Sequence, residues 1–291
     1  MQESLVQLKY LGFPIVFGSP KRAHFLPLLD SINARLLAWK AKTLSFAGHL
    51  ILIKHVLSSI PIYSVAILPL PVSTCKAIER PMRHFLWLGN ATTSKINYVN
   101  WSQVTLPKVE GGLGIRRIAE VNVASLIKLG WQASTMNTIW STWFKNRYFK
   151  NSNIWDPANT FYGSCIWNRI HRLAHFIHQG SAWSIGNGQD INIWNDTWSG
   201  DKPLFAAFPT LYCPPDQRLA SLFHSGSWCI PLDLSFEAQD LLTSATSLLS
   251  LNPSARDQLF WKEAPDGLLT MKIPWSRIRS RGPILQWPSL I

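Results

Sequence analysis

The chain has 291 residues, of which 47% are hydrophobic and 15% charged, and its formal net charge is +12. This composition excludes a disordered chain and is sufficient for a substantial core. Residues 1–150 hold 18 lysines and arginines against 5 acidic residues, a net charge of +13, whereas residues 151–291 hold 10 against 11, a net charge of −1. The asymmetry favours a polyanion partner for the first half, although a basic protein without such a partner would have the same composition.

Apolar spacing predicts three helices before residue 90. Residues 24–43 carry an apolar stripe at steps of three and four. The stripe consists of Phe25, Leu29, Ile32, Leu36 and Trp39. Ser45 is placed to cap a second helix, which Pro61 should stop. Pro71 stands where a third helix could begin, and Pro81 should kink that helix.

Loops and helices alternate over the middle of the chain. Residues 90–112 are expected to form loop and short extended pieces, and Gly111–Gly114 leads into a helix over roughly 116–134. Two more helices are expected near 137–149 and 164–178. The first half is therefore predicted to be mainly helical.

The last part of the chain predicts mixed structure. Residues 183–194 alternate in hydrophobicity on both sides of Gly186-Asn187-Gly188, which predicts a β-hairpin. Residues 199–235 are rich in Pro, Ser and Gly and are the best candidate for a linker. One helix is expected near 236–250, followed by extended pieces.

Together these elements predict a mainly α fold with a small β-hairpin region, that is, an α+β chain in which a helical bundle precedes a Trp-rich mixed segment. Four parts are expected. They are a basic helical region at 1–150, a helix and Trp-rich hairpin at 151–200, a linker at 201–235 and a final segment at 236–291.

Cysteine usage and the N-terminus indicate an intracellular protein, either nuclear or cytoplasmic. The four cysteines form no C-x-x-C pair, which argues against a disulfide framework and against a zinc site. They are Cys75, Cys165, Cys213 and Cys229. The start Met1-Gln2-Glu3 is polar, and the apolar stretch Ile60–Val72 is short and holds three prolines, so neither a signal peptide nor a membrane span is expected.

Two groups of polar residues have a chemical and a structural interpretation each. Asp190, Asp196 and Asp201 could form a metal cluster of the nuclease type, but Asp is also a favoured residue at turns and strand ends. His171, His175 and His178 share a face of the predicted helix, as zinc-binding histidines can. A solvated polar face or an electrostatic contact is the favoured interpretation, because the Glu of the hydrolytic zinc motif is missing.

Basic residues in the first half suit contact with phosphates. Gly111–Gly114 followed by Arg116 and Arg117 could present backbone N–H groups and two guanidinium groups at a helix start. A tight turn explains the glycines equally well. Basic helix faces interleaved with Trp39 and Trp87 fit tracking of a nucleic-acid backbone, or an ordinary solvated surface.

Six segments occur in an order and spacing that resemble plant LINE-type (non-LTR) retrotransposon reverse transcriptases. They are Tyr10–Ile15 (YLGFPI), Trp39–Gly48 (WKAKTLSFAG), Ile53–Leu57 with Ile60–Tyr63 (IKHVL, IPIY), Phe85–Trp87 (FLW), Pro107–Ile115 (PKVEGGLGI) and Trp183–Trp198. A weaker resemblance from Asp257 to Arg279 is to the lead-in of the family's zinc-binding-like region. Its Cys and His residues would lie beyond Ile291.

The resemblance implies that this chain is a C-terminal piece of such an enzyme. The fingers and palm would precede Tyr10, and residues 10–150 would be the helical thumb and connection that grip the template–primer duplex. An upstream endonuclease and any downstream ribonuclease H would also lie outside the chain. Without the palm, the stripe of Leu29, Ile32, Leu36 and Trp39 is expected to be partly exposed, which favours self-association or a need for the missing polymerase domains.

Catalysis by this chain alone is not expected. Polymerase chemistry needs two close carboxylates that hold divalent metals, and the family carries them as an aromatic-x-Asp-Asp turn. No two acidic residues are adjacent here. No cofactor is therefore expected in this chain, since the divalent metal would belong to the absent palm.

The function expected is that of a non-catalytic fragment of an RNA-directed DNA polymerase, which retains at most binding of RNA or DNA through the first half. The alternatives are a repurposed host module that binds nucleic acid or protein, and an enzyme with an unrecognised site near His171. No membrane partner is expected. The candidate nucleic-acid-binding residues are Lys40, Lys42, Lys54, Arg83, Lys108, Arg116 and Arg117.

Overall fold

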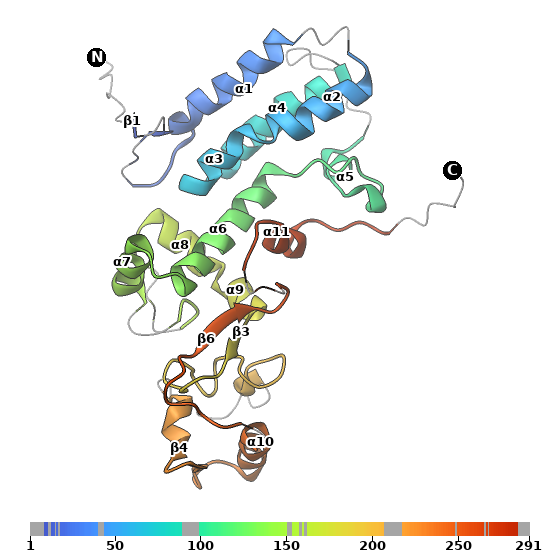
Figure 1. Cartoon of the computed structure of the whole chain (residues 1–291). Coiled ribbons are helices and arrows are strands. Elements are labelled where there is room, and N and C mark those ends of the chain that lie inside the picture. Colours follow the sequence, from blue (N-terminus) through green and yellow to red (C-terminus); the bar gives the residue numbers. More distant parts are fainter. Residues whose placement is uncertain are drawn as a thin grey trace.

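The computed structural model describes residues 9–10, 13–14, 16, 18–39, 44–88, 99–149, 153–156, 159, 162–206, 217–247, 249–264, 266 and 268–284. The molecule is elongated, with helices α1 to α4 at one end, α6 crossing the middle and α10 at the other end (Figure 1). The fold is mainly α with a small β region, as predicted. Its sheets in the described residues are three antiparallel pairs of strands.

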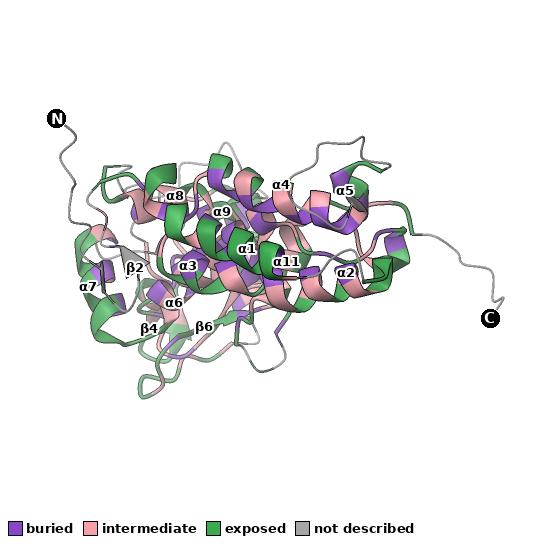
Figure 2. Cartoon of the chain, turned by 90° about the horizontal axis from the view of Figure 1, so that it is seen from above, coloured by how far each residue is buried: buried purple, intermediate pink, exposed green. Residues whose placement is uncertain are grey.

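The first helical part follows the predicted apolar spacing. Helix α1 (Leu26–Ala38) follows the 3-10 turn η1 (Arg22–Phe25) and buries Leu29, Ile32 and Leu36. These residues pack in a core with α2 to α4, and the outward side of α1 is exposed (Figure 2). The expectation that this stripe is partly exposed is therefore wrong for these three residues. Exposed apolar side chains lie elsewhere on the same helices, such as Leu37, which is 71% exposed.

Proline starts helices in this part and does not stop them. Ser45 caps α2 (Phe46–Leu52) by accepting from the Gly48 N–H at 3.3 Å, as predicted. The chain then continues through the π-helical η3 (Ile53–Leu57) into α3 (Ile60–Ile67). Pro61 lies in the first turn of α3, where its missing N–H costs nothing, so the predicted stop is wrong. Helix α4 (Val72–Leu88) begins after Pro71 and is continuous through Pro81.

The run from α2 to α3 is also strongly apolar. Phe46–Ile67 is long and apolar enough to cross a membrane by length and composition alone, and 28% of its most apolar window is buried. The apolar run in the folded chain is thus longer than the Ile60–Val72 stretch that stands out in the sequence. Core helices of soluble proteins pass the same test, so the absence of a membrane partner stays a prediction.

Helix α6 (Ile118–Thr135) joins two cores. Its first turns pack with α3 and α4, and its last turns pack with α7 (Ile139–Tyr148), α8 (Cys165–Arg172) and α9 (Ala174–Gly180). In its second turn, Asn122 forms two buried hydrogen bonds with the backbone of Leu70. Gly130 allows close approach, because a Cβ there would lie 2.6 Å from Ile177 and 2.7 Å from Ile170. The helical half and the following residues are therefore one packed body.

The predicted hairpin at residues 183–194 is wrong. Strand β3 (Ser181–Ser184) pairs with β6 (Gln258–Trp261), with Ser181 opposite Trp261. The loop after β3 cannot fold back as a hairpin turn because Asp257 holds it. This carboxylate accepts from the N–H groups of Gly186, Gly188 and Asp190, at 2.7, 2.9 and 3.0 Å.

The segment expected to be a linker contributes to a third core instead. Leu204 of η5 (Leu204–Ala206), and Leu219 and Leu222 of η6 (Leu219–Leu222), are buried against Trp194 and α10 (Phe236–Thr246). The boundaries of the four expected parts stay a prediction.

The remaining short elements complete the fold. Strands β4 (Phe223–His224) and β5 (Ser227–Trp228) form a tight hairpin whose turn residues, Ser225 and Gly226, both have positive φ. The other elements are β1 (Lys9–Tyr10), β2 (Phe13–Pro14), α5 (Trp101–Val104), η4 (Lys108–Glu110) and α11 (Lys272–Ile278).

Candidate nucleic-acid interface

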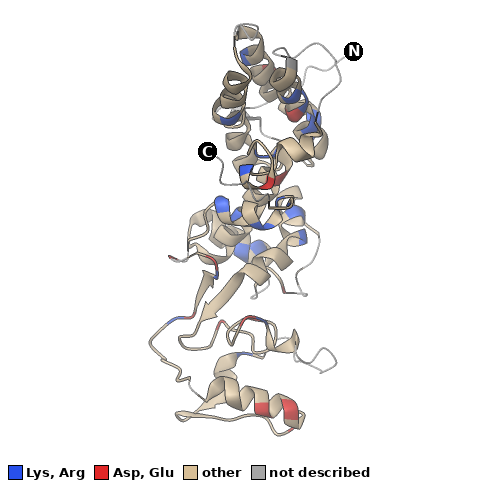
Figure 3. Ribbon diagram, turned by 90° about the vertical axis from the view of Figure 1, so that its right-hand side faces the viewer, with Lys and Arg blue, Asp and Glu red and all other residues tan. Residues whose placement is uncertain are grey.

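Lysine and arginine residues lie mainly in the helical and middle parts of the molecule, whereas α10 carries acidic residues (Figure 3). Among the candidate residues, Lys54 and Lys108 lie close together beside Gly114. A Cβ on Gly114 would be 3.4 Å from Lys54 Nζ and 3.9 Å from Lys108 Cγ. Burial lowers the pKa of Lys54, and the positive charge of Lys108 lowers it further. Two neighbouring ammonium groups of this kind attract an anion.

The glycine loop that precedes α6 is a tight structural turn. Gly111 and Gly114 have φ angles of +81° and +70°, and a Cβ on Gly112 would lie 2.0 Å from the Leu106 carbonyl oxygen. The N–H groups of all three glycines and of Leu113 donate to carbonyl groups within the turn, between residues 104 and 108. The predicted phosphate cradle is therefore wrong, because these donors are already used.

The start of α6 already holds a carboxylate. The Ile118 N–H donates to Glu79 Oε1 at 2.7 Å, and Glu79 is buried on α4. Burial raises the pKa of Glu79, while the Ile118 N–H and the nearby charge of Arg117 lower it. Glu79 thus occupies the place at the helix N-terminus that was expected for a phosphate.

The candidate arginines pack against aromatic rings or near Glu79. The Arg83 guanidinium lies 5.6 Å from the centroid of the Trp101 ring, and that of Arg116 lies 5.1 Å from the centroid of Trp275. Arg116 is still exposed. Lys40 and Lys42 lie outside the described residues. Of the five candidates that the structure describes, Lys54 and Lys108 are brought together beside Gly114, and a binding role for any of the seven stays a prediction.

Trp275 belongs to a clasp that joins α11 to the first half. Its ring lies between Arg116 and Arg279, whose guanidinium is 5.7 Å from the ring centroid. Arg279 also donates two hydrogen bonds to Glu110, at 2.5 and 2.9 Å, and the Gly282 N–H donates a third. Arg279 and this N–H lower the pKa of Glu110 to about 2. Sequence reasoning missed the clasp because its residues are about 170 positions apart.

Of the three aspartates considered as metal ligands, Asp196 is held by hydrogen bonds inside the Trp-rich segment. Asp196 is buried and accepts from Asn153, from the Trp155 indole at 2.9 Å and from the Asn192 N–H at 2.8 Å. Burial raises the pKa of Asp196 to about 6. Within the described ranges, no three His, Cys, Asp or Glu residues are grouped to hold a metal. Asp196 is therefore a structural acceptor for the loops around it.

The three histidines do not lie on one helix. The helical conformation is interrupted at Leu173, so His171 belongs to α8, and His175 and His178 belong to α9. His171 packs against Trp167, with ring centroids 5.0 Å apart, and His178 stacks on Trp155 at 4.8 Å. Burial lowers the pKa of His178 to about 4. The predicted single helix and its shared histidine face are wrong.

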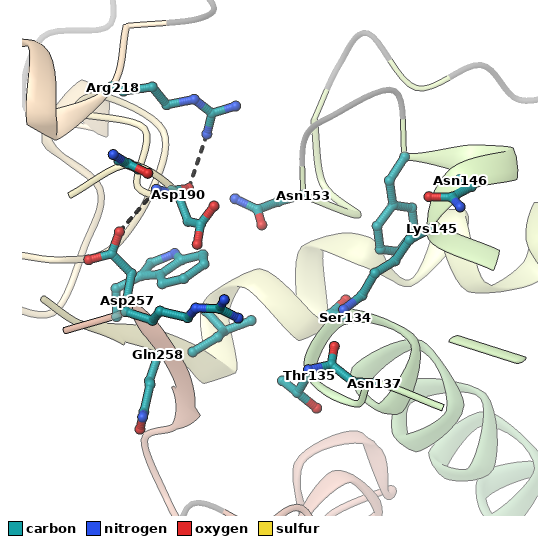
Figure 4. A pocket seen from close by; sticks show the side chains of 15 residues that line it. Ser134, Thr135, Asn137, Lys145, Asn146, Asn153, Asp190, Arg218, Asp257 and Gln258 are labelled. Carbon is teal, nitrogen blue, oxygen red and sulfur yellow. Dashed lines mark hydrogen bonds between the residues drawn. The ribbon is translucent and has the colours of Figure 1, made fainter. Parts of the chain in front are cut away.

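A polar cavity of about 980 Å³ lies between the α6–α7 corner and the loop that Asp257 holds (Figure 4). Thr135 and Lys145 line one side, and Asp190 and Arg218 line the other. The lining is polar, and its residues come from segments more than 100 positions apart. No local motif could have indicated it.

Two proteins from Arabidopsis thaliana are similar to this chain. The chain is 32% identical over 272 residues to a protein named "Putative ribonuclease H protein". The match covers 89% of this chain but only 43% of that protein. The chain is also 27% identical over 146 residues to an uncharacterized mitochondrial protein, with 50% of this chain and 95% of that protein covered. No family model and no solved structure matches.

Proposed function

We propose that this chain is a C-terminal, non-catalytic piece of a plant LINE-type retrotransposon reverse transcriptase that binds nucleic acid through its basic first half. The ordered motifs between Tyr10 and Trp198 support this origin. The similarity over 89% of the chain to a plant protein named as a putative ribonuclease H also supports this origin.

The observation that carries the binding proposal is the Lys54–Lys108 pair. The two side chains come from η3 and η4, which are 54 positions apart, and converge beside Gly114. Within the described residues, the ion pairs join Glu263 to Arg277 and Glu110 to Arg279. Neither of them involves the Lys54–Lys108 pair. Two converging ammonium groups match a phosphate backbone and read no bases. Binding should therefore depend on salt and little on sequence.

The binding experiment uses the whole chain. A cut near residue 150 would separate α6 from α8, α9 and α11, against which it packs. We expect the double variant Lys54→Gln/Lys108→Gln to bind a nucleic-acid duplex about tenfold more weakly than the wild type at low salt, because two phosphate contacts are lost. The matched control is Lys202→Gln/Lys272→Gln, which removes the same charge from exposed positions of the second half. Equal weakening in both variants would mean that the lost affinity comes from the lower net charge and not from the Lys54–Lys108 pair.

The non-catalytic part of the proposal has its own test. We expect no primer extension on an RNA template with magnesium or manganese, because no two acidic residues are adjacent in the chain. Hydrolysis of the RNA strand of an RNA–DNA hybrid is measured in parallel, since a relative is named for ribonuclease H. Either activity above a buffer control, retained through repurification, contradicts the proposal.

A further inference from the structure

The polar cavity lies where residues 134–149 meet residues of the second half, and its lining carries three cationic side chains, Lys145, Arg218 and Arg256, against two carboxylates, Asp190 and Asp257. Lys145 comes from α7, Arg256 immediately precedes Asp257, and Arg218 lies across from Asn153. We propose that this cavity binds nucleotides of a single-stranded nucleic acid, with Lys145 and Arg256 on phosphate oxygens and Trp183 against a base.

The charges in the cavity favour an anion. Lys145 Nζ donates to the Met136 carbonyl at 3.2 Å, and within the described residues neither Lys145 nor Arg256 forms an ion pair with a carboxylate. The Asp257 carboxylate oxygens already accept hydrogen bonds from three backbone N–H groups. Asp190 remains as the acidic side chain that faces Lys145. The cavity therefore has more available positive than negative charge.

The rest of the lining suits a base and a sugar. Trp183 is partly buried in the wall, and its indole N–H has no hydrogen-bond partner in the described structure. Amide side chains, which both donate and accept, also line the cavity and can meet base edges or ribose hydroxyls. They include Asn137, Asn146, Gln189 and Gln258. An aromatic ring beside cations is the usual arrangement for binding single strands without sequence preference.

The size of the cavity suits unpaired nucleotides better than a duplex. A volume of about 980 Å³ is at the upper end of the range for small-molecule sites. It admits unpaired nucleotides, whereas the Lys54–Lys108 pair is proposed to meet a duplex backbone. The two proposals rest on different residues, so one can fail while the other holds.

The test measures the affinity of the whole chain for a labelled oligothymidine single strand and, separately, for a duplex. We expect Lys145→Gln/Arg256→Gln to weaken single-strand binding about tenfold and to leave duplex binding within about twofold of the wild type, because two phosphate contacts are lost only in the cavity. Trp183→Phe keeps an aromatic ring and should weaken single-strand binding less than Trp183→Leu, since stacking of a base on an aromatic ring contributes about 1–3 kcal/mol.

The control variant is Arg147→Gln/Arg172→Gln, which removes two exposed arginines of α7 and α8 that do not line the cavity. Wild-type affinity of the Lys145→Gln/Arg256→Gln variant for the single strand overturns the proposal, and so does an equal loss in the control. If Lys54→Gln/Lys108→Gln loses duplex binding while the cavity variant binds single strands normally, the cavity proposal fails and the proposed function stands. Far-ultraviolet circular dichroism confirms that each variant is folded.

Discussion

The helical part and the mixed part of this chain are held together by different forces. In α1 to α4, aliphatic and aromatic side chains at helical spacing fill a core, and most charged groups stay outside it. In the mixed part, the loops between β3 and β6 are fixed by two carboxylates, Asp196 and Asp257, which accept backbone and side-chain hydrogen bonds. Periodic burial forms the first part, whereas the second part combines a smaller core with individual polar contacts that fix its loops.

The difference matters for how each part responds to substitution. Loss of one aliphatic group from a helical core costs the transfer and cavity energy of that group. Loss of one carboxylate from the loops leaves several buried donors without acceptors, and each carries a desolvation cost. The mixed part should therefore depend more on single polar residues than the helical part does.

The largest effect is expected at Gly112, an exception within the helical part. The variant Gly112→Ala should lower the free energy of unfolding by about 3–4 kcal/mol, because its Cβ would collide with the Leu106 carbonyl and the backbone must move. Gly48→Ala is the control, since its Cβ would meet Leu44 at an ordinary 3.5 Å and alanine favours the helix. Urea denaturation measures both. Similar stability of the two variants would show that the close approach at Gly112 does not constrain the turn.

A loss of about 3 kcal/mol is expected for Asp257→Ala, because three N–H groups lose their acceptor at once. Asp257→Asn keeps one acceptor oxygen and should lose less. Asp240→Ala, on the exposed side of α10, should change the free energy of unfolding by less than about 0.5 kcal/mol. If Asp257→Ala is as stable as Asp240→Ala, the mixed part does not depend on its carboxylates.

A smaller, pH-dependent effect is expected at Asp196. Its pKa of about 6 lies above the value of about 3.9 for an unfolded chain, so between these pH values the folded protein holds a proton that the unfolded chain has released. The contribution of Asp196 to stability should thus fall by about 2–3 kcal/mol as pH rises from about 4 to about 6. Asp196→Asn does not titrate and should lack this slope.

His178 has the opposite effect over the same pH window. Its pKa of about 4 means that the unfolded chain binds a proton that the folded protein does not, so its contribution rises with pH. The measurement is therefore the difference between wild type and Asp196→Asn in denaturant titrations at several pH values. A difference that does not change with pH would contradict the raised pKa of Asp196.

The helices could be predicted because their apolar residues recur with helical spacing. Leu29, Ile32 and Leu36 are buried as that spacing requires, and Ser45 caps its helix. The partner of β3 could not be predicted, since Gly186-Asn187-Gly188 has the composition of a hairpin turn, whereas its backbone is held by residues distant in the sequence, Asp257 among them. Local patterns describe local structure, whereas β3 and β6 are about 75 positions apart.

The candidate site was predicted only in part for the same reason. Lys54 and Lys108 were both named from the sequence, yet nothing in the sequence indicates that they meet beside Gly114. The phosphate cradle at Gly111–Gly114 was wrong because the glycine N–H groups donate to carbonyls of their own turn, and the Glu79 carboxylate from α4 accepts the Ile118 N–H at the start of α6. The polar cavity combines α7, the loop after β3 and the residues before β6, a combination that depends on the tertiary fold.

The central claim, that Lys54 and Lys108 neutralise phosphates, is tested most directly by the salt dependence of duplex binding. The logarithm of the binding constant of the whole chain is plotted against the logarithm of salt concentration, for wild type and for Lys54→Gln/Lys108→Gln. The account predicts a slope smaller in magnitude by about 1.8 in the variant, since each neutralised phosphate contributes about 0.9. Parallel lines for the two proteins would contradict it.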